Sequence, residues 1–251
     1  MRRVSLHRAA CLAAMICLLS VGEFCKAVSV SLTPVADAFV SSANPQRNYG
    51  GAGALAVSAG GLAKGELRTV LRFDMSAAQA SFDTAIGAGQ WLIENITLQL
   101  AAAAPNNPMF NSSAAGLLGL QWMQNDAWTE GSGTPNGISG DGITYETLPA
   151  FLGPDDQSLG VFAFDGRTNG AIVLNLASSA GLTADVHAGA LASIQLSPED
   201  PGVSGVFNSR SFGQVLNRPV LTITAILVPE PASLLPMISA LLLMIRRRGV
   251  N

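Results

Sequence analysis

Residues 67–76 read LRTVLRFDMS, and within them Leu67, Thr69, Leu71 and Phe73 occupy every second position. Alternation with a period of two is typical of a β-strand that buries one face. The same alternation recurs in seven further stretches: 28–32, 96–100, 118–122, 159–163, 172–176, 192–196 and 221–227. Turn-forming segments rich in Gly, Pro and Asn separate them, for example 131–142. The sequence therefore predicts an all-β fold, an antiparallel β-sandwich with jelly-roll connections.

Helical patterns are few in the same region. Residues 177–190 are the best candidate for a short helix, and residues 77–89 could form one further turn. Neither pattern supports an α/β fold. The length of 28–228 suits one all-β domain, so we expect a single sandwich there.

The first residues have the order of an export signal. Arg2, Arg3 and Arg8 precede the apolar run 9–21, and Cys25-Lys26-Ala27 offers a small-residue cleavage site. We expect residues 1–27 to form a signal peptide with a helical core; a retained anchor and a lipoprotein at Cys25 are the alternatives. Because all three cysteines lie in this segment, we expect a mature chain without thiol or disulfide chemistry.

The last residues have a three-part pattern: Pro229-Glu230-Pro231, an uncharged run over 232–245, and Arg246, Arg247 and Arg248. As a helix the run would rise about 21 Å, less than the ~30 Å hydrocarbon core of a bilayer. Residues 229–251 resemble the PEP-CTERM sorting signal of bacterial surface proteins. The resemblance implies a hydrophobic C-terminal helix that holds the chain in the membrane before an exosortase processes it. A plain membrane-anchoring tail is the alternative.

The net charge of residues 28–228 limits the kinds of molecule that this part of the chain can bind. Residues 28–228 contain seven basic and fifteen acidic side chains. An excess of acidic groups argues against nucleic-acid binding and offers carboxylates to divalent cations.

A set of short motifs in this body points to a family. They are Ala36-Asp37-Ala38-Phe39-Val40, Asn48-Tyr49-Gly50, the 67–76 stretch, Trp128-Thr129-Glu130-Gly131, Ile143-Thr144-Tyr145 and Phe207-Asn208-Ser209-Arg210. In this order they resemble the DNRLRE-type domain of secreted bacterial proteins over about residues 31–228. The resemblance implies a β-sandwich of the kind found in carbohydrate-binding modules. The run Ala101–Ala104, the loop 131–142 and Tyr145, where a second Trp is expected, depart from it.

Three aromatic residues are candidates for carbohydrate contact: Trp128, Tyr49 and Tyr145. Flat rings stack on the C–H faces of sugars, although core packing is the alternative for Trp128. Trp122 alternates with Leu118 and Leu120 and is expected in the core. By family architecture, Asp37 could join Glu199 or Asp200 in a structural Ca²⁺ site.

Catalytic signals are weak. His187 is the one histidine of the body, with no nucleophile elbow around any serine. We therefore predict no catalytic residues and no enzyme, but an exported structural or binding protein of the cell surface or extracellular matrix, with carbohydrate as the candidate ligand. The alternative is a secreted polysaccharide-degrading enzyme that uses paired carboxylates, such as Asp155 with Asp156 or Asp126 with Glu130.

Overall fold

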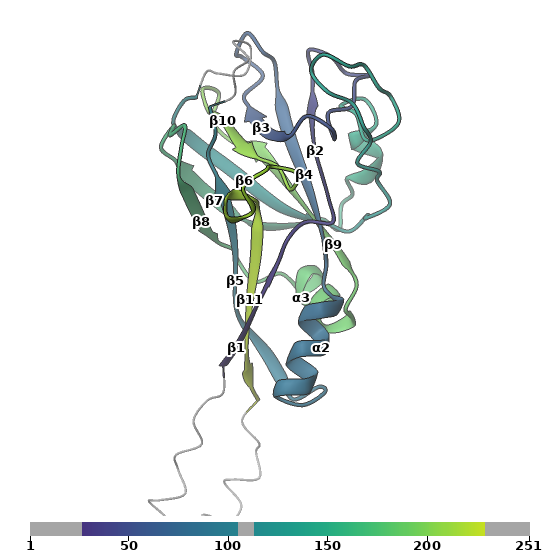
Figure 1. Cartoon of the computed structure of the whole chain (residues 1–251), viewed down its shortest axis with the longest axis vertical. Coiled ribbons are helices and arrows are strands. Elements are labelled where there is room, and N and C mark those ends of the chain that lie inside the picture. Colours follow the sequence, from purple (N-terminus) through teal and green to yellow (C-terminus); the bar gives the residue numbers. More distant parts are fainter. Residues whose placement is uncertain (1–26, 105–112, 229–251) are drawn as a thin grey trace, which may run out of the picture.

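The computed structural model describes residues 27–104 and 113–228. The predicted signal segment up to residue 26 and the predicted sorting segment 229–251, with Pro229, Glu230, Pro231 and Arg246 to Arg248, lie outside the described residues. Two packed antiparallel sheets make up most of the described chain (Figure 1). Among these residues, no helix is both long enough and apolar enough to cross a membrane.

The smaller sheet has four strands in the order β1-β11-β5-β8. Its strands are β1 (Ala27–Leu32), β11 (Val220–Leu227), β5 (Trp91–Ala101) and β8 (Ala171–Asn175). Every neighbouring pair is antiparallel. Because Ala27 pairs with Ile226 and Trp91 with Leu227, the start of β1 and the end of β11 lie at one end of this sheet.

The larger sheet has seven strands, six of them in the order β10-β3-β4-β9-β6-β7, with β2 paired to β4. Its strands are β2 (Ala36–Ser41), β3 (Ala54–Ser58), β4 (Leu67–Asp74), β6 (Gly116–Met123), β7 (Gln157–Phe164), β9 (Leu191–Pro198) and β10 (Ser204–Asn208). Strand pairing is nested along the chain, with β6 beside β7, β5 beside β8, β4 beside β9 and β1 beside β11. Jelly rolls are built on nested pairing of this kind.

The core lies between the two sheets and is filled by the alternating residues that the sequence singles out. Leu71 and Phe73 of β4 and Leu98 and Leu100 of β5 are all fully buried in it. Trp122 also packs in this core, as predicted. Sheets packed face to face at about 10 Å leave room for side chains alone, so this core is not a ligand site.

Two α-helices close one end of the sandwich (Figure 1). They are α2 (Ser76–Ala85) and α3 (Ala180–Ala188), which agree with the predicted helical patterns. The side chain of Ser179 accepts a hydrogen bond from the backbone of Leu182 at the start of α3, and Gly189 ends the helix in the left-handed conformation. Two 3₁₀ turns complete the elements: η1 (Leu148–Phe151) and η2 (Val215–Asn217).

The prediction for β7 was right about the strand and wrong about its face. Leu159 is buried, but Val161 and Ala163 point outward while Phe164 is buried. A bulge causes the change, because the pairing of β6 with β7 slips by one residue beside Gly160, which has a φ of 122°. The alternation signal also missed β2, β3 and β10, which have apolar residues on both faces.

The outer face of the larger sheet is covered by the chain between β6 and β7, residues 124–156, called here the covering segment. Trp128, Ile143 and Leu148 of this segment pack on Ala38 and Val70 of the sheet. A second apolar core therefore forms outside the sandwich, which explains why β2 and β4 are buried on both sides.

Candidate functional site

Asn48 attaches the covering segment to the sandwich. Its fully buried side chain donates Nδ2 to the carbonyl oxygens of Glu130 (2.6 Å) and Ile143 (2.8 Å). Its Oδ1 accepts from the backbone N–H groups of Gly50 and Gly133, both at 3.0 Å. All four hydrogen-bonding positions of one carboxamide are thus used. The role of Asn48 and of the Asn48-Tyr49-Gly50 motif is therefore to hold the covering segment in place.

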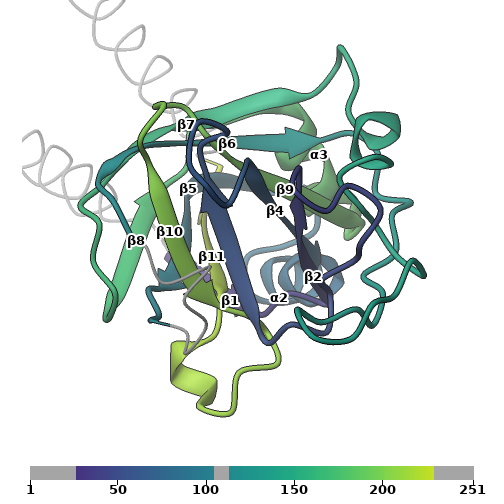
Figure 2. The same ribbon diagram turned by 90° about the horizontal axis from the view of Figure 1, so that it is seen from above.

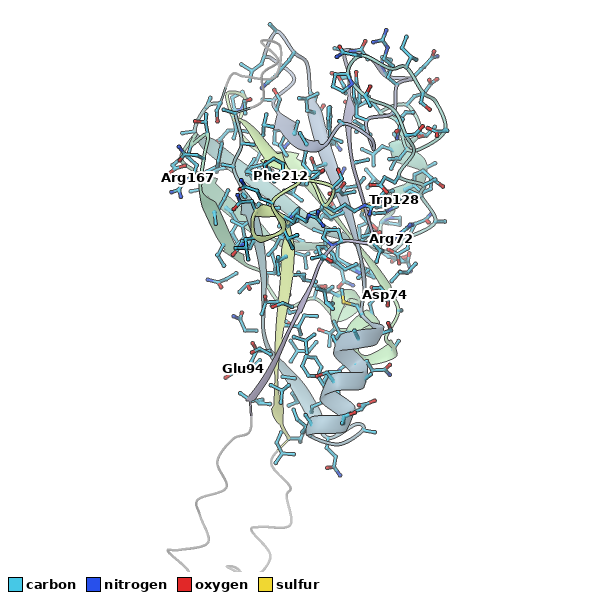
Figure 3. All side chains as sticks on the ribbon, viewed as in Figure 1. Arg72, Asp74, Glu94, Trp128, Arg167 and Phe212 are labelled. Atoms are coloured by element: carbon cyan, nitrogen blue, oxygen red, sulfur yellow. The ribbon has the colours of Figure 1, made fainter. Side chains whose placement is uncertain are left out.

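Trp128 was a candidate for carbohydrate contact, and the structure shows that this was wrong. Its ring is only 1% exposed, and its Nε1 donates to Ser193 Oγ at 2.8 Å. The Arg72 guanidinium lies 4.8 Å from the ring centroid and donates to the carbonyl oxygens of Asp126 and Trp128. Trp128 anchors the covering segment (Figure 3).

The two tyrosines differ. Tyr49 is 3% exposed and stacks on Phe39, with 4.5 Å between ring centroids, so its assignment to a binding surface was wrong as well. Tyr145 is partly exposed, and its hydroxyl donates to Glu66 Oε2 at 2.8 Å. A ring platform made of Trp128, Tyr49 and Tyr145 does not exist in this fold.

Asp37 is itself buried and belongs to a partly buried charged cluster with Glu130 and Arg210 rather than to a metal site. Its Oδ2 accepts from the backbone N–H of Arg210 at 2.6 Å, and its own N–H donates to Glu130 Oε1 at 3.2 Å. The Arg210 guanidinium pairs with both oxygens of the Glu130 carboxylate. Burial raises the pKa of Asp37 from 3.8 to about 7; the Arg210 N–H opposes this rise, and the Glu130 charge adds to it. The cluster ties β2, the covering segment and the loop after β10 together.

The predicted Ca²⁺ site is not formed. The Asp200 carboxylate accepts from the backbone N–H of Leu117 at 2.8 Å, and Glu199 lies against Gly119 of β6, whereas Asp37 faces Glu130 and Arg210. In residues 27–104 and 113–228, no three His, Cys, Asp or Glu side chains gather so that they could hold a metal ion.

Among the carboxylates considered for catalysis, Asp156 and Glu130 have structural contacts. Asp156 accepts from the backbone N–H groups of Gln124 and Gly153 at 2.9 and 3.0 Å. Burial raises the pKa of Asp126, and it raises that of Asp185 to about 6 although Trp122 Nε1 donates to Asp185. His187 stacks on Trp91 at 4.0 Å, on the outside of α3.

A pocket of about 300 Å³ lies where β5 and β10 end and β8 and β11 begin. It is lined by Ala101–Ala104, Asn169, Gly170, Asn208, Phe212 and Asn217. Among the described residues, the lining includes three carboxamides, which have donor and acceptor groups, one aromatic residue and no charged side chain. The alanines at the end of β5 leave the space open because they have only a methyl group. Phe212 lies well apart from Arg72 and Trp128 (Figure 3).

The loop 209–218 forms one wall of this pocket and is braced by its own contacts. Arg218 Nε donates a hydrogen bond to the backbone carbonyl oxygen of Phe212 at 2.7 Å. Asn208 Nδ2 donates to the backbone carbonyl oxygen of Asn217 at 3.1 Å. The Arg210 pairing with Glu130 and Asp37 fixes the start of the loop. Figure 2 shows this loop standing out from the sandwich beside β11. A wall held in this way loses little conformational entropy on binding.

The sequence reasoning did not select these residues. The alanine run, Asn169 and the loop after β10 are far apart in the sequence and lie together only in the fold, so the sequence gives no sign that they line one pocket. The run Ala101–Ala104 was noted as a departure from the family pattern, and it now forms the floor of the pocket. A second hollow of about 370 Å³, lined by residues 43–47 and Ile138, has no aromatic ring in its lining.

Comparison with known families matches residues 28–163 to the family model described as carbohydrate-binding module family 96. The match covers more than half of the chain and runs from β1 to the end of β7. The alanine floor of the pocket lies inside the match, and its asparagines and Phe212 lie beyond it. A comparison with curated proteins gave no match.

Proposed function

The chain belongs to carbohydrate-binding module family 96, and on this premise we propose that its sandwich binds a polysaccharide at the pocket lined by Phe212 and three asparagines. The observation that carries the location is the lining itself. It combines one ring with Asn169, Asn208 and Asn217 and has no charge. Sugars offer an apolar C–H face and neighbouring hydroxyl groups, and these two features need such partners.

The chemistry of recognition follows from the groups present. A sugar ring lies on Phe212 by its C–H face. Asn208 Nδ2 and Asn217 Nδ2 already donate to the Asn217 carbonyl oxygen and to Gln214 Oε1, so the sugar hydroxyls bind the exposed Asn169 carboxamide and the hydrogen-bonding positions that remain on Asn208 and Asn217. Each net hydrogen bond contributes about 1 kcal/mol, and burial of the apolar ring face adds to this. Since no carboxylate is among the described residues that line this pocket, and Asp37 and Glu130 are occupied by Arg210, we propose binding without turnover.

We also propose that the protein is exported and works at the cell surface or in extracellular matrix. The support is in the sequence: residues 1–27 have the order of a signal peptide, and Pro229-Glu230-Pro231 opens a segment of the type that an exosortase processes. Before processing, the segment would hold the chain at the membrane. Mass spectrometry of the protein from its native cells tests this route, with a mature form that lacks both segments as the expected result.

Binding is tested by titrating immobilised neutral and acidic polysaccharides with the purified protein and with Phe212→Ala. We expect the variant to lose about tenfold in affinity, because it removes a ring that a sugar covers. Leu216→Ala is the matched control, since Leu216 is 89% exposed in the same loop and does not line the pocket. Equal binding by Phe212→Ala would refute the site, and release of reducing sugars would point to an enzyme.

A further inference from the structure

The outer face of the four-stranded sheet carries an unusual set of side chains. In the central rows of the sheet the outward-pointing residues are polar and uncharged, and together they are called here the hydroxyl-amide face: Ser29, Ser31, Asn95, Thr97, Gln99, Asn175, Thr222 and Thr224. All are exposed or partly exposed. Apolar residues flank these rows: Val173, 57% exposed, and Val220 lie beside Gln99 at one end, and Leu92, 51% exposed, lies beside Ile226 beyond Glu94 at the other.

Strand pairing places these side chains in rows. Ser31 lies beside Thr222, Thr222 beside Thr97, and Thr97 beside Asn175, so one row crosses all four strands. Adjacent strands are about 4.8 Å apart, which sets the spacing of the row. The hydroxyls of Ser31 and Thr222 are 2.9 Å apart, and those of Ser29 and Thr224 are 2.8 Å apart. These contacts hold the hydroxyls in fixed positions before any ligand arrives.

The face is uncharged although the body of the protein has fifteen acidic side chains. Glu94, in the bulge of β5, is the charged residue at one boundary of the face, at the end of the sheet where β1 begins and β11 ends (Figure 3). The edge strands β1 and β8 contain no charged residue either.

The face continues into the pocket. Gln99 pairs with Val220 and Val173, and two residues further along β5 Ala101 forms the pocket floor beside Gly170. A chain that leaves the pocket towards the sheet therefore meets Gln99 first and then the row of Thr97 and Asn175. The pocket is at the small end of ligand sites, and it can hold only a short part of a polymer.

We infer that the hydroxyl-amide face is a second binding surface, on which a polysaccharide chain anchored in the pocket extends across the sheet and is held through its hydroxyl groups. This inference rests on the proposed function. A second copy of the protein fits less well, because stable interfaces between copies are rich in large apolar residues, and the two central rows, which run from Ser31 to Asn175 and from Ser29 to Asn95, contain none. The contacts are uncharged hydrogen bonds, so they are insensitive to salt.

The test measures affinity against the length of oligosaccharides cut from the polysaccharide that the protein binds. We expect affinity to rise with length beyond what the pocket holds, and the triple variant Thr97→Val, Gln99→Ala, Asn175→Ala to lose about tenfold for long oligosaccharides but not for the shortest. Thr97→Val keeps a branched side chain suited to a strand, so the fold is retained. Gln121→Ala, at a partly exposed glutamine on β6 of the other sheet, is the control.

The outcomes separate the two proposals. Binding that depends on Phe212 but neither grows with length nor responds to the triple variant would overturn the second surface and leave the pocket in place. Loss of binding by the triple variant for the shortest oligosaccharide would also overturn it. A dimer of the unmodified protein that the triple variant dissociates would show that a second copy, rather than glycan, covers the face.

Discussion

Replacement of Asn48 by Ala is the sharpest test of how the covering segment is held. The change removes a fully buried carboxamide that makes four hydrogen bonds with backbone groups. It leaves the N–H groups of Gly50 and Gly133 and the carbonyl oxygen of Ile143 without a partner in places where water has little access. Each such orphan costs about 1–3 kcal/mol.

Two buried donors alone therefore cost about 4 kcal/mol. That is close to half the stability of a typical domain, about 5–15 kcal/mol. Asn48→Asp is the informative second variant. It keeps nearly the same shape, but it places an oxygen against the carbonyl oxygens of Glu130 and Ile143, so we expect no rescue.

The assay is urea unfolding followed by tryptophan fluorescence, since Trp128 lies in the covering segment and reports its release. Asn136→Ala is the control, at an exposed asparagine of the same segment, and should stay within about 0.5 kcal/mol of the unmodified protein. A loss below about 1 kcal/mol for Asn48→Ala, or recovery in Asn48→Asp, would refute the reasoning.

Three further changes test the same contacts. The pKa of Asp37 is about 7 in the folded protein against 3.8 in the unfolded chain, so its ionisation lowers the free energy of unfolding as pH rises from about 4 to 7. We expect Asp37→Asn to lack this contribution, so that its urea midpoint falls less between pH 5 and pH 8 than that of the unmodified protein. Gly133→Ala should lower the melting temperature, since its Cβ would lie 2.0 Å from the Asn48 carbonyl oxygen, and an unchanged melting temperature would contradict the packing. Trp128→Phe, which removes the indole N–H that donates to Ser193 Oγ, should lower the free energy of unfolding by about 1 kcal/mol in chemical unfolding, and a neutral effect would argue against the anchor.

The layers of the fold could be predicted because alternation of apolar residues is a local signal. Leu71, Phe73, Leu98 and Leu100 all lie in the core where the period of two places them. The bulge at Gly160 could not be predicted, because it depends on how β7 pairs with β6. One inserted residue then reverses which side chains face inward.

The predictions of the site residues were wrong for a different reason. Trp128 sits in a polar loop sequence, and it is buried only because the covering segment folds back on β4 and β9 and meets Arg72 and Ser193. Sequence shows the aromatic residue but not the contact. The pocket could not be predicted because alanine and asparagine are common residues and give no signal in the sequence. They line a pocket only because the ends of β5, β8, β10 and β11 lie together in the fold.

The most direct test of the central proposal is chemical-shift mapping by NMR, with an oligosaccharide from the bound polysaccharide titrated into the isotope-labelled protein. The account predicts that shifts gather at Ala101–Ala104, Asn169, Asn208 and the loop 209–218, and spread to Gln99, Thr97 and Asn175 as the oligosaccharide becomes longer. Shifts confined to the hollow formed by residues 43–47 and Ile138, or no shifts at saturating oligosaccharide, would contradict it.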